Sequence, residues 1–229
     1  VAGVQGNGQE QLIKAITGLI PFQDGTVKLA GTEIQGMNIA QKRDAGMSYI
    51  PEDRMIDGSA PAASIQDNLI STCYEQPKYS GKIFLKQSVI REESQELIDR
   101  FSIKTQSEKE KVSALSGGNI QKVVVAREWN NKPKLMIAEQ PTRGIDIGSA
   151  AYIHHQLIDM RNSGAAVLLV SADLNEVLKL SDRLIVMYEG EIVAYFPSLK
   201  GVTESQLGLY MLGVEHQSEK EIREASYDD

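Results

Sequence analysis

The 229-residue sequence is poor in cysteine and has no long apolar segment. Its single cysteine, Cys73, cannot form an internal disulfide, which fits a protein kept in a reducing compartment. No run of about 18 apolar residues is present, so no membrane-spanning helix is expected, and a signal-peptide pattern is also lacking. There is no Cys/His cluster for zinc. The adjacent His154 and His155 point to different faces of an expected helix, so we interpret both as structural or solvated.

Basic residues are also fewer than acidic ones. The chain has 24 Lys and Arg against 31 Asp and Glu, a formal net charge of -7. A nonspecific nucleic-acid binder needs a basic face, so no nucleic-acid partner is expected. The hydrophobic content of 41% is that of an ordinary globular protein with one sizeable core.

Short apolar segments alternate with helical ones along the chain. The runs at 135–138 and 165–170 are apolar throughout, which indicates strands buried on both faces. Their alternation with helices predicts an α/β fold with a mainly parallel sheet. Strands at 184–188 and 191–196 are expected to form a hairpin. The expected helices lie at 9–17, 39–44, 120–129, 148–162, 173–180 and 203–211.

The composition shifts toward helix and charge between about 60 and 114. We expect an inserted helical subdomain there, with helices at 65–74 and 89–101. Residues 215–229 are polar and charged and are expected to be a disordered tail. The predicted organisation is therefore one domain, 1–214, followed by that tail.

Residues 115–122 read LSGGNIQK and open an expected helix. Small residues at a helix N-terminus favour anion binding, because the first amides lack intrahelical partners and the helix dipole is positive there. Taken alone, the same residues are typical of an ordinary N-cap by Ser116. The segment that follows decides between these two interpretations, through the resemblance described next. In it, the apolar run 135–138 ends in EQPT and then RGID, at 139–146.

This ordered set resembles the signature motif, Walker B strand and D-loop of ABC-type ATPases. The resemblance implies a P-loop NTPase fold of ABC type and the cofactors ATP and Mg²⁺. It assigns the D-loop aspartate to Asp146. It assigns the signature to Ser116, Gly117, Gly118, Asn119 and Gln121.

A glycine-rich segment, GVQGNGQE at 3–10, lies where a P-loop belongs, between a strand end at Val1-Ala2 and a helix start. The pattern G-x-x-x-x-G-K-[ST] is matched at Gly3 and Gly8. Gln9 replaces the Lys that places charge on the phosphates, and Glu10 replaces the hydroxyl residue that binds Mg²⁺.

The amides of this segment, from Gly6 through Asn7 to Glu10, can still cradle an anion. The alternative is a plain glycine-rich turn without a ligand. A dinucleotide-binding G-x-G-x-x-G on Gly6 and Gly8 is excluded, because Gln11 stands where the third glycine is needed.

Other catalytic positions also depart from the ABC pattern. Glu139 stands where the Mg²⁺-associated Asp is expected, and Gln140 where a Glu acts as general base. A carboxamide cannot accept a proton as a carboxylate does. Ala172, in VSADL, stands at the switch His and has no side-chain group for a γ-phosphate. Glu52, in PEDR, occupies the Q-loop position, and no metal-ligand set is assigned within the chain.

The signature is therefore retained while the catalytic positions are lost. In ABC dimers each nucleotide lies between one domain's P-loop and the other domain's signature. We expect this chain to complete a partner's ATP site, where ATP and Mg²⁺ are mainly held. Sequence decay is the alternative, but it would not preferentially spare the signature, the D-loop and the glycines.

The combined motifs are similar to the second nucleotide-binding domain of tandem-domain importers for simple sugars and nucleosides, and most similar to the nucleoside branch. The resemblance implies an upstream ABC domain, membrane permease subunits that dock beside residues 52–62, and, indirectly, an extracytoplasmic binding protein. It implies a peripheral position at the cytoplasmic face of the membrane. Because the chain starts at the P-loop strand, we expect the N-terminal β strands of the domain to be missing.

Two alternatives remain open. A non-hydrolysing regulatory nucleotide-binding module is favoured for the isolated chain by the residues at positions 9, 10, 140 and 172. A soluble, non-transport ABC protein is less favoured, because residues 60–114 show no sustained heptads. An intact ABC domain encoded upstream would support the importer.

Overall fold

The computed structural model describes residues 1–21 and 24–227. The chain divides into two compact units. Unit 1 comprises Val1–Ala45 and Leu168–Asp229, and unit 2 comprises Gly46–Val167. In the described parts of the chain, no helix is both long and apolar enough to cross a bilayer.

Unit 1 contains the antiparallel pair β6 (Leu184–Tyr188) and β7 (Glu191–Phe196). The expected hairpin is confirmed. Its two turn residues, Glu189 and Gly190, have φ angles of 49° and 85°. Left-handed conformations at both positions give a turn whose twist matches that of the flanking strands.

The first residues of the chain extend this sheet. The Ala2 N–H donates to Ile185 O and the Met187 N–H donates to Ala2 O, each at 2.9 Å, and the pairing is parallel. A buried strand end at Val1-Ala2 was expected, and both residues are buried. The chain then enters the glycine-rich loop and helix α1 (Gln9–Thr17), as predicted.

The apolar core of unit 1 packs these strands against α7 (Leu174–Leu180) and α8 (Glu204–Met211). Burial of apolar surface stabilises such a core by about 25 cal/mol per Å². The core supports both the residues before the glycine-rich loop and the helix that follows Ala172. Its buried members are Ala2, Val177, Leu184, Val186, Val193, Ala194, Phe196, Leu207 and Met211.

The remaining elements of unit 1 are short. Strands β1 (Lys28–Leu29) and β2 (Thr32–Glu33) form a small antiparallel hairpin. Helix α2 (Ile39–Asp44) begins with a reciprocal capping box, in which the Asn38 side chain accepts from Gln41 N–H and the Gln41 side chain accepts from Asn38 N–H.

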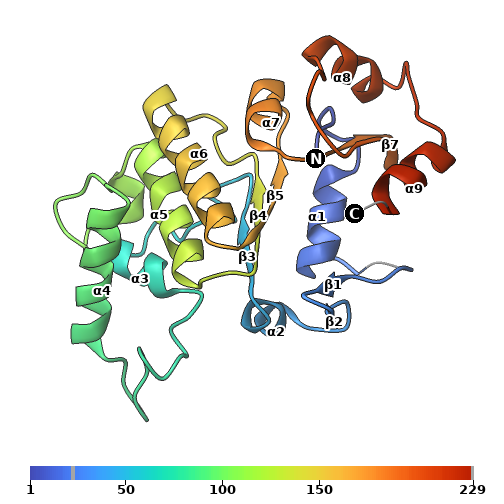
Figure 1. Ribbon diagram of the computed structural model, residues 1–229. Coiled ribbons are helices and arrows are strands. Elements are labelled where there is room, and N and C mark those ends of the chain that lie inside the picture. The colour runs from blue at the N-terminus through green and yellow to red at the C-terminus, as the bar shows by residue number, and fades with distance from the viewer. Residues whose placement is uncertain (22–23, 228–229) are drawn as a thin grey trace. The chain divides into compact units, whose positions relative to one another are not determined.

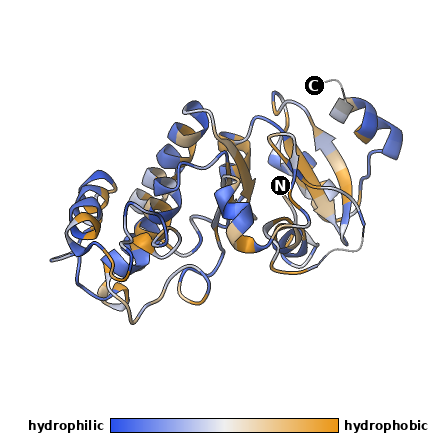
Figure 2. Cartoon of the chain, turned by 90° about the horizontal axis from the view of Figure 1, so that it is seen from below, coloured by the Kyte–Doolittle hydropathy of each residue, from blue (hydrophilic) through white to orange (hydrophobic). Residues whose placement is uncertain are grey.

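The C-terminal residues differ from the expected disordered tail. They form helix α9 (Glu219–Tyr227), which is mostly hydrophilic in Figure 2. Gln217 joins the segment to β7: its side chain accepts from Tyr195 N–H at 2.8 Å, and its N–H donates to Val193 O at 2.9 Å. These contacts supply order that composition does not indicate. Residues 228–229 of that prediction lie outside the described residues.

Unit 2 contains the parallel strands β3 (Met47–Ile50) and β4 (Leu135–Glu139). Strand β5 (Ala166–Val170) extends the sheet in the order β3-β4-β5 and continues into unit 1. Its first residue donates its N–H to Lys134 O at 2.8 Å. The predicted parallel α/β sheet is confirmed.

Helices α3 (Ile65–Ile70), α4 (Gln87–Arg100), α5 (Gly117–Asn130) and α6 (Ile147–Asn162) complete unit 2 (Figure 1). A short 3₁₀ turn, η1 (Val112–Ala114), precedes α5. Both α3 and α4 pack against α5, so the expected helical part lies inside unit 2. Helix α3 ends at Ile70, four residues before its predicted end, and the chain continues as turns.

Candidate nucleotide-binding site

The glycine-rich loop of unit 1 is fixed against the β6–β7 turn. Asn7 accepts from Gly190 N–H at 3.0 Å through its carbonyl and from Glu189 N–H at 3.2 Å through Oδ1. Gly8, with φ of 100°, is the N-cap of α1. A Cβ on Gly8 would lie 2.9 Å from Gly190 Cα, so only glycine fits this approach.

The two substituted P-loop positions behave differently. The Gln9 side chain is buried and folds back on the loop, where Nε2 donates to Val4 O at 3.2 Å. A Cβ on Gly3 would lie 1.9 Å from the same Nε2, so Gly3 makes room for this amide. Glu10 points outward and pairs with Lys14 at 2.5 Å. Neither residue supplies a positive charge to the loop.

The switch segment follows β5 in unit 1. Ala172 is exposed. The next residue, Asp173, caps α7 through Oδ1, which accepts from Asn175 N–H at 2.9 Å and from Glu176 N–H at 3.3 Å. The aspartate therefore has a structural role, and position 172 has no side-chain hydrogen-bonding group.

The signature lies at the start of α5 in unit 2. The helix begins at Gly117, three residues earlier than predicted, with Ser116 as an exposed N-cap residue. The Ser116 side chain makes no capping bond, and its Oγ accepts from Asn119 Nδ2 at 2.8 Å. Asn119 Oδ1 in turn accepts from Lys104 N–H at 2.8 Å. Gln121, assigned to the signature from the sequence, is buried and is not on the exposed surface.

The expected D-loop aspartate lies beside the expected signature. Asp146 caps α6: it accepts from Ser149 N–H at 2.9 Å and from Ser149 Oγ at 2.7 Å. These bonds, the hydroxyl first, lower the pKa of Asp146. A Cβ on Gly118 would lie 2.3 Å from Ser149 Oγ, so Gly118 permits close contact between the signature helix and this cap.

The Q-loop position is linked to the turn after β4. Glu52 forms an ion pair with Arg143. Arg54 donates to Arg143 O at 2.8 Å through Nη1 and to Gly144 O at 3.1 Å through Nη2. A Cβ on Gly117 would lie 2.9 Å from the same Nη2. One guanidinium thus contacts the D-loop turn and the start of the signature helix.

The end of β4 places the two Walker B positions. Glu139 is buried, and Tyr49 OH donates to its Oε2 at 2.5 Å. Gln140 has φ of 46°, a left-handed conformation that is uncommon outside glycine and is typical of constrained functional turns. Glu139 retains a carboxylate at the expected Mg²⁺-associated position, and Gln140 retains a polar side chain without basic character.

Unit 2 therefore brings together the expected signature, D-loop, Q-loop and Walker B residues. The expected glycine-rich loop and switch residues lie in unit 1. Sequence reasoning missed Tyr49, Arg54 and Arg143 as partners of these motifs. The PEDR and PTRG strings place two arginines next to the motifs, but their pairing joins positions about 90 residues apart.

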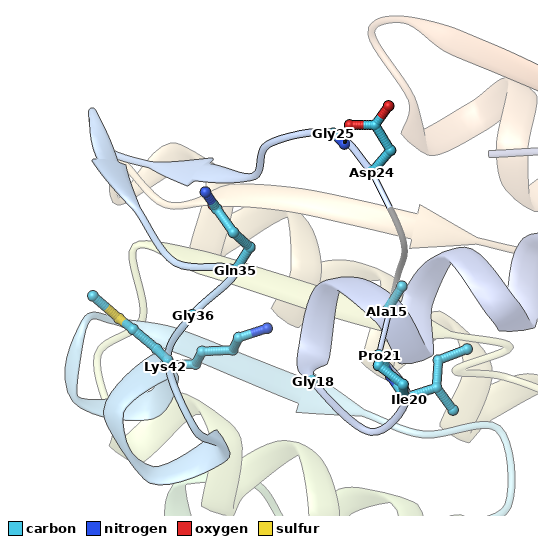
Figure 3. Close-up of a pocket in the computed structure, with 10 residues that line it drawn as sticks. Ala15, Gly18, Ile20, Pro21, Asp24, Gly25, Gln35, Gly36 and Lys42 are labelled. Atoms are coloured by element: carbon cyan, nitrogen blue, oxygen red, sulfur yellow. Dashed lines mark hydrogen bonds between the residues drawn. The ribbon is translucent and has the colours of Figure 1, made fainter.

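A cavity of about 580 Å³ lies at the C-terminal end of α1, away from the glycine-rich loop (Figure 3). Lys42 points into it toward Gly18, and burial lowers the pKa of this amine. The Lys42 Nζ donates to Ile16 O at 2.8 Å, so its charge serves the C-terminus of α1. No residue assigned to the candidate site lines this cavity.

Residues 1–143 match the family model described as ABC transporter. The chain belongs to the ABC transporter family. It is 39% identical over 213 residues to the guanosine import ATP-binding protein NupO of Bacillus subtilis, covering 93% of this chain and 42% of that protein. The nucleoside import ATP-binding protein NupA of Lactococcus lactis is 38% identical with the same coverage. The glucose import ATP-binding protein TsgD13 of Haloferax volcanii is 35% identical, covering 93% of this chain and 39% of that protein.

Solved structures show the same fold. A nucleotide-free ATP-binding cassette from an ABC transporter superposes with a TM-score of 0.71 at 22% identity, covering 100% of this chain and 87% of that one. A further ATP-binding cassette gives a TM-score of 0.75 at 21% identity, with coverages of 93% and 85%. The fold is therefore that of an ABC ATPase. The ABC chain spans about two fifths of the length of the curated relatives.

Proposed function

We propose that this chain is an ATP-binding component of an ABC importer for nucleosides or simple sugars. Its signature completes an ATP site whose P-loop belongs to a second ABC domain, while its own P-loop is degenerate. The observation that carries the proposal is the contrast between the two half-sites. The signature is ordered, with Ser116 exposed at the start of a 14-residue helix. The P-loop offers no cationic side chain, because Gln9 and Glu10 replace its charged and hydroxyl residues.

The two domains contribute different chemical groups to the composite site. The N-terminus of α5 supplies backbone N–H groups and the positive end of the helix dipole to the terminal phosphate. The general base comes from the partner, because Gln140 cannot accept a proton. Glu139 retains one carboxylate at the expected Mg²⁺-associated position, but Glu10 replaces the hydroxyl residue with which a P-loop binds Mg²⁺. We therefore assign Mg²⁺ and ATP mainly to the partner's P-loop.

A dimeric arrangement is consistent with one structural neighbour. The post-hydrolysis state of a cassette bound to ADP and Pi is dimeric, and this chain superposes on it with a TM-score of 0.71 at 21% identity. The likeness concerns the fold, so the dimer is part of the proposal. The partner domain lies in the upstream part of the same polypeptide.

Permease subunits of the membrane are the expected docking partners, and an extracytoplasmic binding protein acts through them. The loop at 52–62 is the proposed contact. Asp53 Oδ1 accepts from Met55 N–H at 2.8 Å and from Ile56 N–H at 3.0 Å, which shapes a turn with both apolar side chains exposed. Because this loop also carries Glu52 and Arg54, a docked permease helix can act directly on the D-loop turn. The chain itself is proposed to be peripheral at the cytoplasmic face.

The substrate class follows from the relatives' names. NupO and NupA are import proteins for guanosine and for nucleosides, and TsgD13 is one for glucose. We favour nucleosides, because NupO and NupA are 39% and 38% identical to this chain, against 35% for TsgD13. Uptake of labelled guanosine and glucose by cells with and without the gene separates the two.

The composite site is tested by Ser116→Arg in the complete transporter. We expect the ATPase rate to fall by about 10²-fold or more, the scale of losing an oriented donor at a developing charge. The matched control is Ser113→Arg, which puts the same bulk on an exposed serine of η1 outside the helix N-terminus. Equal rates in the two variants would show that the signature is only a helix start.

The ATPase rate of the isolated chain distinguishes this proposal from its alternatives. We expect ATPase near background with Mg²⁺, since a general base contributes roughly 10²- to 10⁴-fold in rate. Robust turnover that Gln140→Ala abolishes would contradict the degenerate site. A regulatory module that never hydrolyses ATP predicts no effect of Ser116→Arg in the complete transporter.

A further inference from the structure

A basic hairpin in unit 2 is not used by the proposed site. Residues 76–90 contain three lysines and no acidic residue, although the whole chain carries a net charge of -7. Between α3 and α4 the chain runs outward beyond the ends of both helices (Figure 1). We refer to residues 78–86 as the lysine hairpin.

The lysine hairpin is a defined turn. The Gly81 N–H donates to Phe84 O at 2.9 Å, and the Lys86 N–H donates to Tyr79 O at 2.7 Å. Ser80 and Leu85 form an antiparallel bridge between these bonds. The backbone pairing presents the residues of the tip, centred on Lys82 and Ile83, in one orientation.

A buried residue anchors the base of the hairpin. Tyr79 is 2% exposed, and its hydroxyl donates to Glu93. Asn130 Nδ2 donates to Tyr79 OH at 3.0 Å and to Glu93 Oε1 at 2.7 Å. The base of the hairpin is therefore anchored on α4 and α5, so the tip is exposed although the hairpin itself is held in place.

The tip combines apolar and cationic side chains. Ile83 is 84% exposed and Phe84 is 80% exposed. Lys78 pairs with Glu93, but no described carboxylate forms an ion pair with Lys82 or Lys86. The Lys86 Nζ donates to Pro77 O at 2.8 Å and remains exposed. Exposed apolar side chains flanked by unpaired lysines are the chemistry that recognises an anionic lipid surface.

We propose that the tip of the lysine hairpin is a membrane-contact site: Ile83 and Phe84 enter the interfacial region of an anionic bilayer while Lys82 and Lys86 contact lipid phosphates. A bilayer interface accepts a convex apolar tip without a complementary pocket. A stable protein interface needs roughly 800 Å² per partner, far more than Ile83 and Phe84 supply.

The negative charge of the chain does not oppose this contact strongly. At physiological ionic strength charges beyond about 8 Å are largely screened, so the local lysines determine the attraction. Each lysine near an anionic surface raises the membrane partition coefficient of the chain about fivefold. The contact is weak and reversible, and it would orient the helical part of unit 2 toward the membrane independently of any permease.

The test uses the full 229-residue chain with vesicles that contain no protein. One set is pure phosphatidylcholine, and the other also contains phosphatidylglycerol. We expect co-sedimentation with the second set, a loss when salt rises from about 0.1 to 0.5 M, and little binding to the first. Absence of binding to the phosphatidylglycerol vesicles overturns the proposal without affecting the proposed ATP site.

Paired variants locate the contact. Ile83→Ser/Phe84→Ser should reduce binding at least tenfold, and Lys82→Glu about tenfold or more. The apolar control is Met55→Ser/Ile56→Ser, in which Ile56 is 79% exposed but lies between Asp53 and Asp57. The charge control is Lys220→Glu in α9, where the side chain is 82% exposed. Equal losses in controls and hairpin variants refute the site.

A spectroscopic reading gives independent evidence. In Phe84→Trp the added indole should shift its emission to shorter wavelength with phosphatidylglycerol vesicles, relative to the background of Trp129. Ile56→Trp should show no shift. Unchanged melting temperatures exclude misfolding as the cause of lost binding. A hairpin-dependent dimer by light scattering, without an emission shift, would assign the tip to self-association and overturn the proposal.

Discussion

The buried ion pair within the signature helix offers the sharpest stability test. Arg127 Nε donates to Glu128 Oε1 at 2.8 Å, and the two side chains are 8% and 0% exposed. The Arg127 Nη1 also donates to Gly58 O at 2.8 Å, and Glu128 Oε2 accepts from Tyr49 N–H at 3.2 Å. The pair thus joins α5 to β3 and to the loop that carries the Q-loop position.

Arg127→Met removes the guanidinium but keeps an apolar chain of similar length. Glu128 then loses the Arg127 guanidinium while it remains buried, and Gly58 O loses the Arg127 N–H. Breaking a buried pair on one side costs about 3–5 kcal/mol in free energy of unfolding. A neutral residue at 128 relieves part of this penalty, so the double variant Arg127→Met/Glu128→Gln should be more stable than the single one.

Urea unfolding of both variants measures this difference, with unit 2 followed separately by hydrogen exchange in α5. The matched control is Lys220→Met, since the side chains of Lys220 and its partner Glu224 are 82% and 67% exposed. An exposed pair contributes about 0–1 kcal/mol. If Arg127→Met costs no more than Lys220→Met, or if the double variant is no more stable than the single one, the reasoning is refuted.

Two further predictions concern the D-loop. The folded state lowers the pKa of Asp146, so the stabilisation from this carboxylate is present above the ordinary value of 3.8 and is lost as pH falls through the lowered value. Asp146→Asn should therefore flatten the acid side of a plot of melting temperature against pH. An unchanged plot would contradict this. Gly118→Ala places a methyl 2.3 Å from Ser149 Oγ and should lower both the melting temperature and the ATPase rate of the complete transporter. Gly208→Ala in α8, where nothing lies within 4 Å, should leave the ATPase rate unchanged and not lower the melting temperature.

Local sequence signals predicted the regular elements of the fold well. Helix α2 and strands β6 and β7 have the predicted bounds, because an Asn cap and two short strand segments joined by a turn are signals within the segments themselves. The end of α3 and the order at α9 depend on distant contacts. Tyr79 is buried in the helical part of unit 2, and the Gln217 side chain accepts a hydrogen bond from β7. Neither contact can be predicted from the neighbouring residues in the sequence.

In the candidate site too, local features could be predicted from the sequence and long-range contacts could not. The motifs indicated where the signature, the Q-loop and the D-loop are expected, because each is a contiguous string, and all three lie in unit 2. The contacts that join them were not predictable, since the Arg54 guanidinium reaches carbonyls about 90 residues away. The burial of Gln121 also follows from packing of α5 that the motif does not encode.

Packing explains some of these motif residues without any ligand. Gly8 and Gly118 are each required because a Cβ would lie 2.9 Å and 2.3 Å, respectively, from neighbouring atoms of the chain. Their presence therefore says little about nucleotide binding. Ser116 is different: it is exposed, its side chain does not cap α5, and its hydroxyl accepts from Asn119 of the same motif. An exposed hydroxyl at the positive end of a helix is what the proposed composite ATP site requires. The proposal of a composite ATP site rests on that residue more than on the glycines.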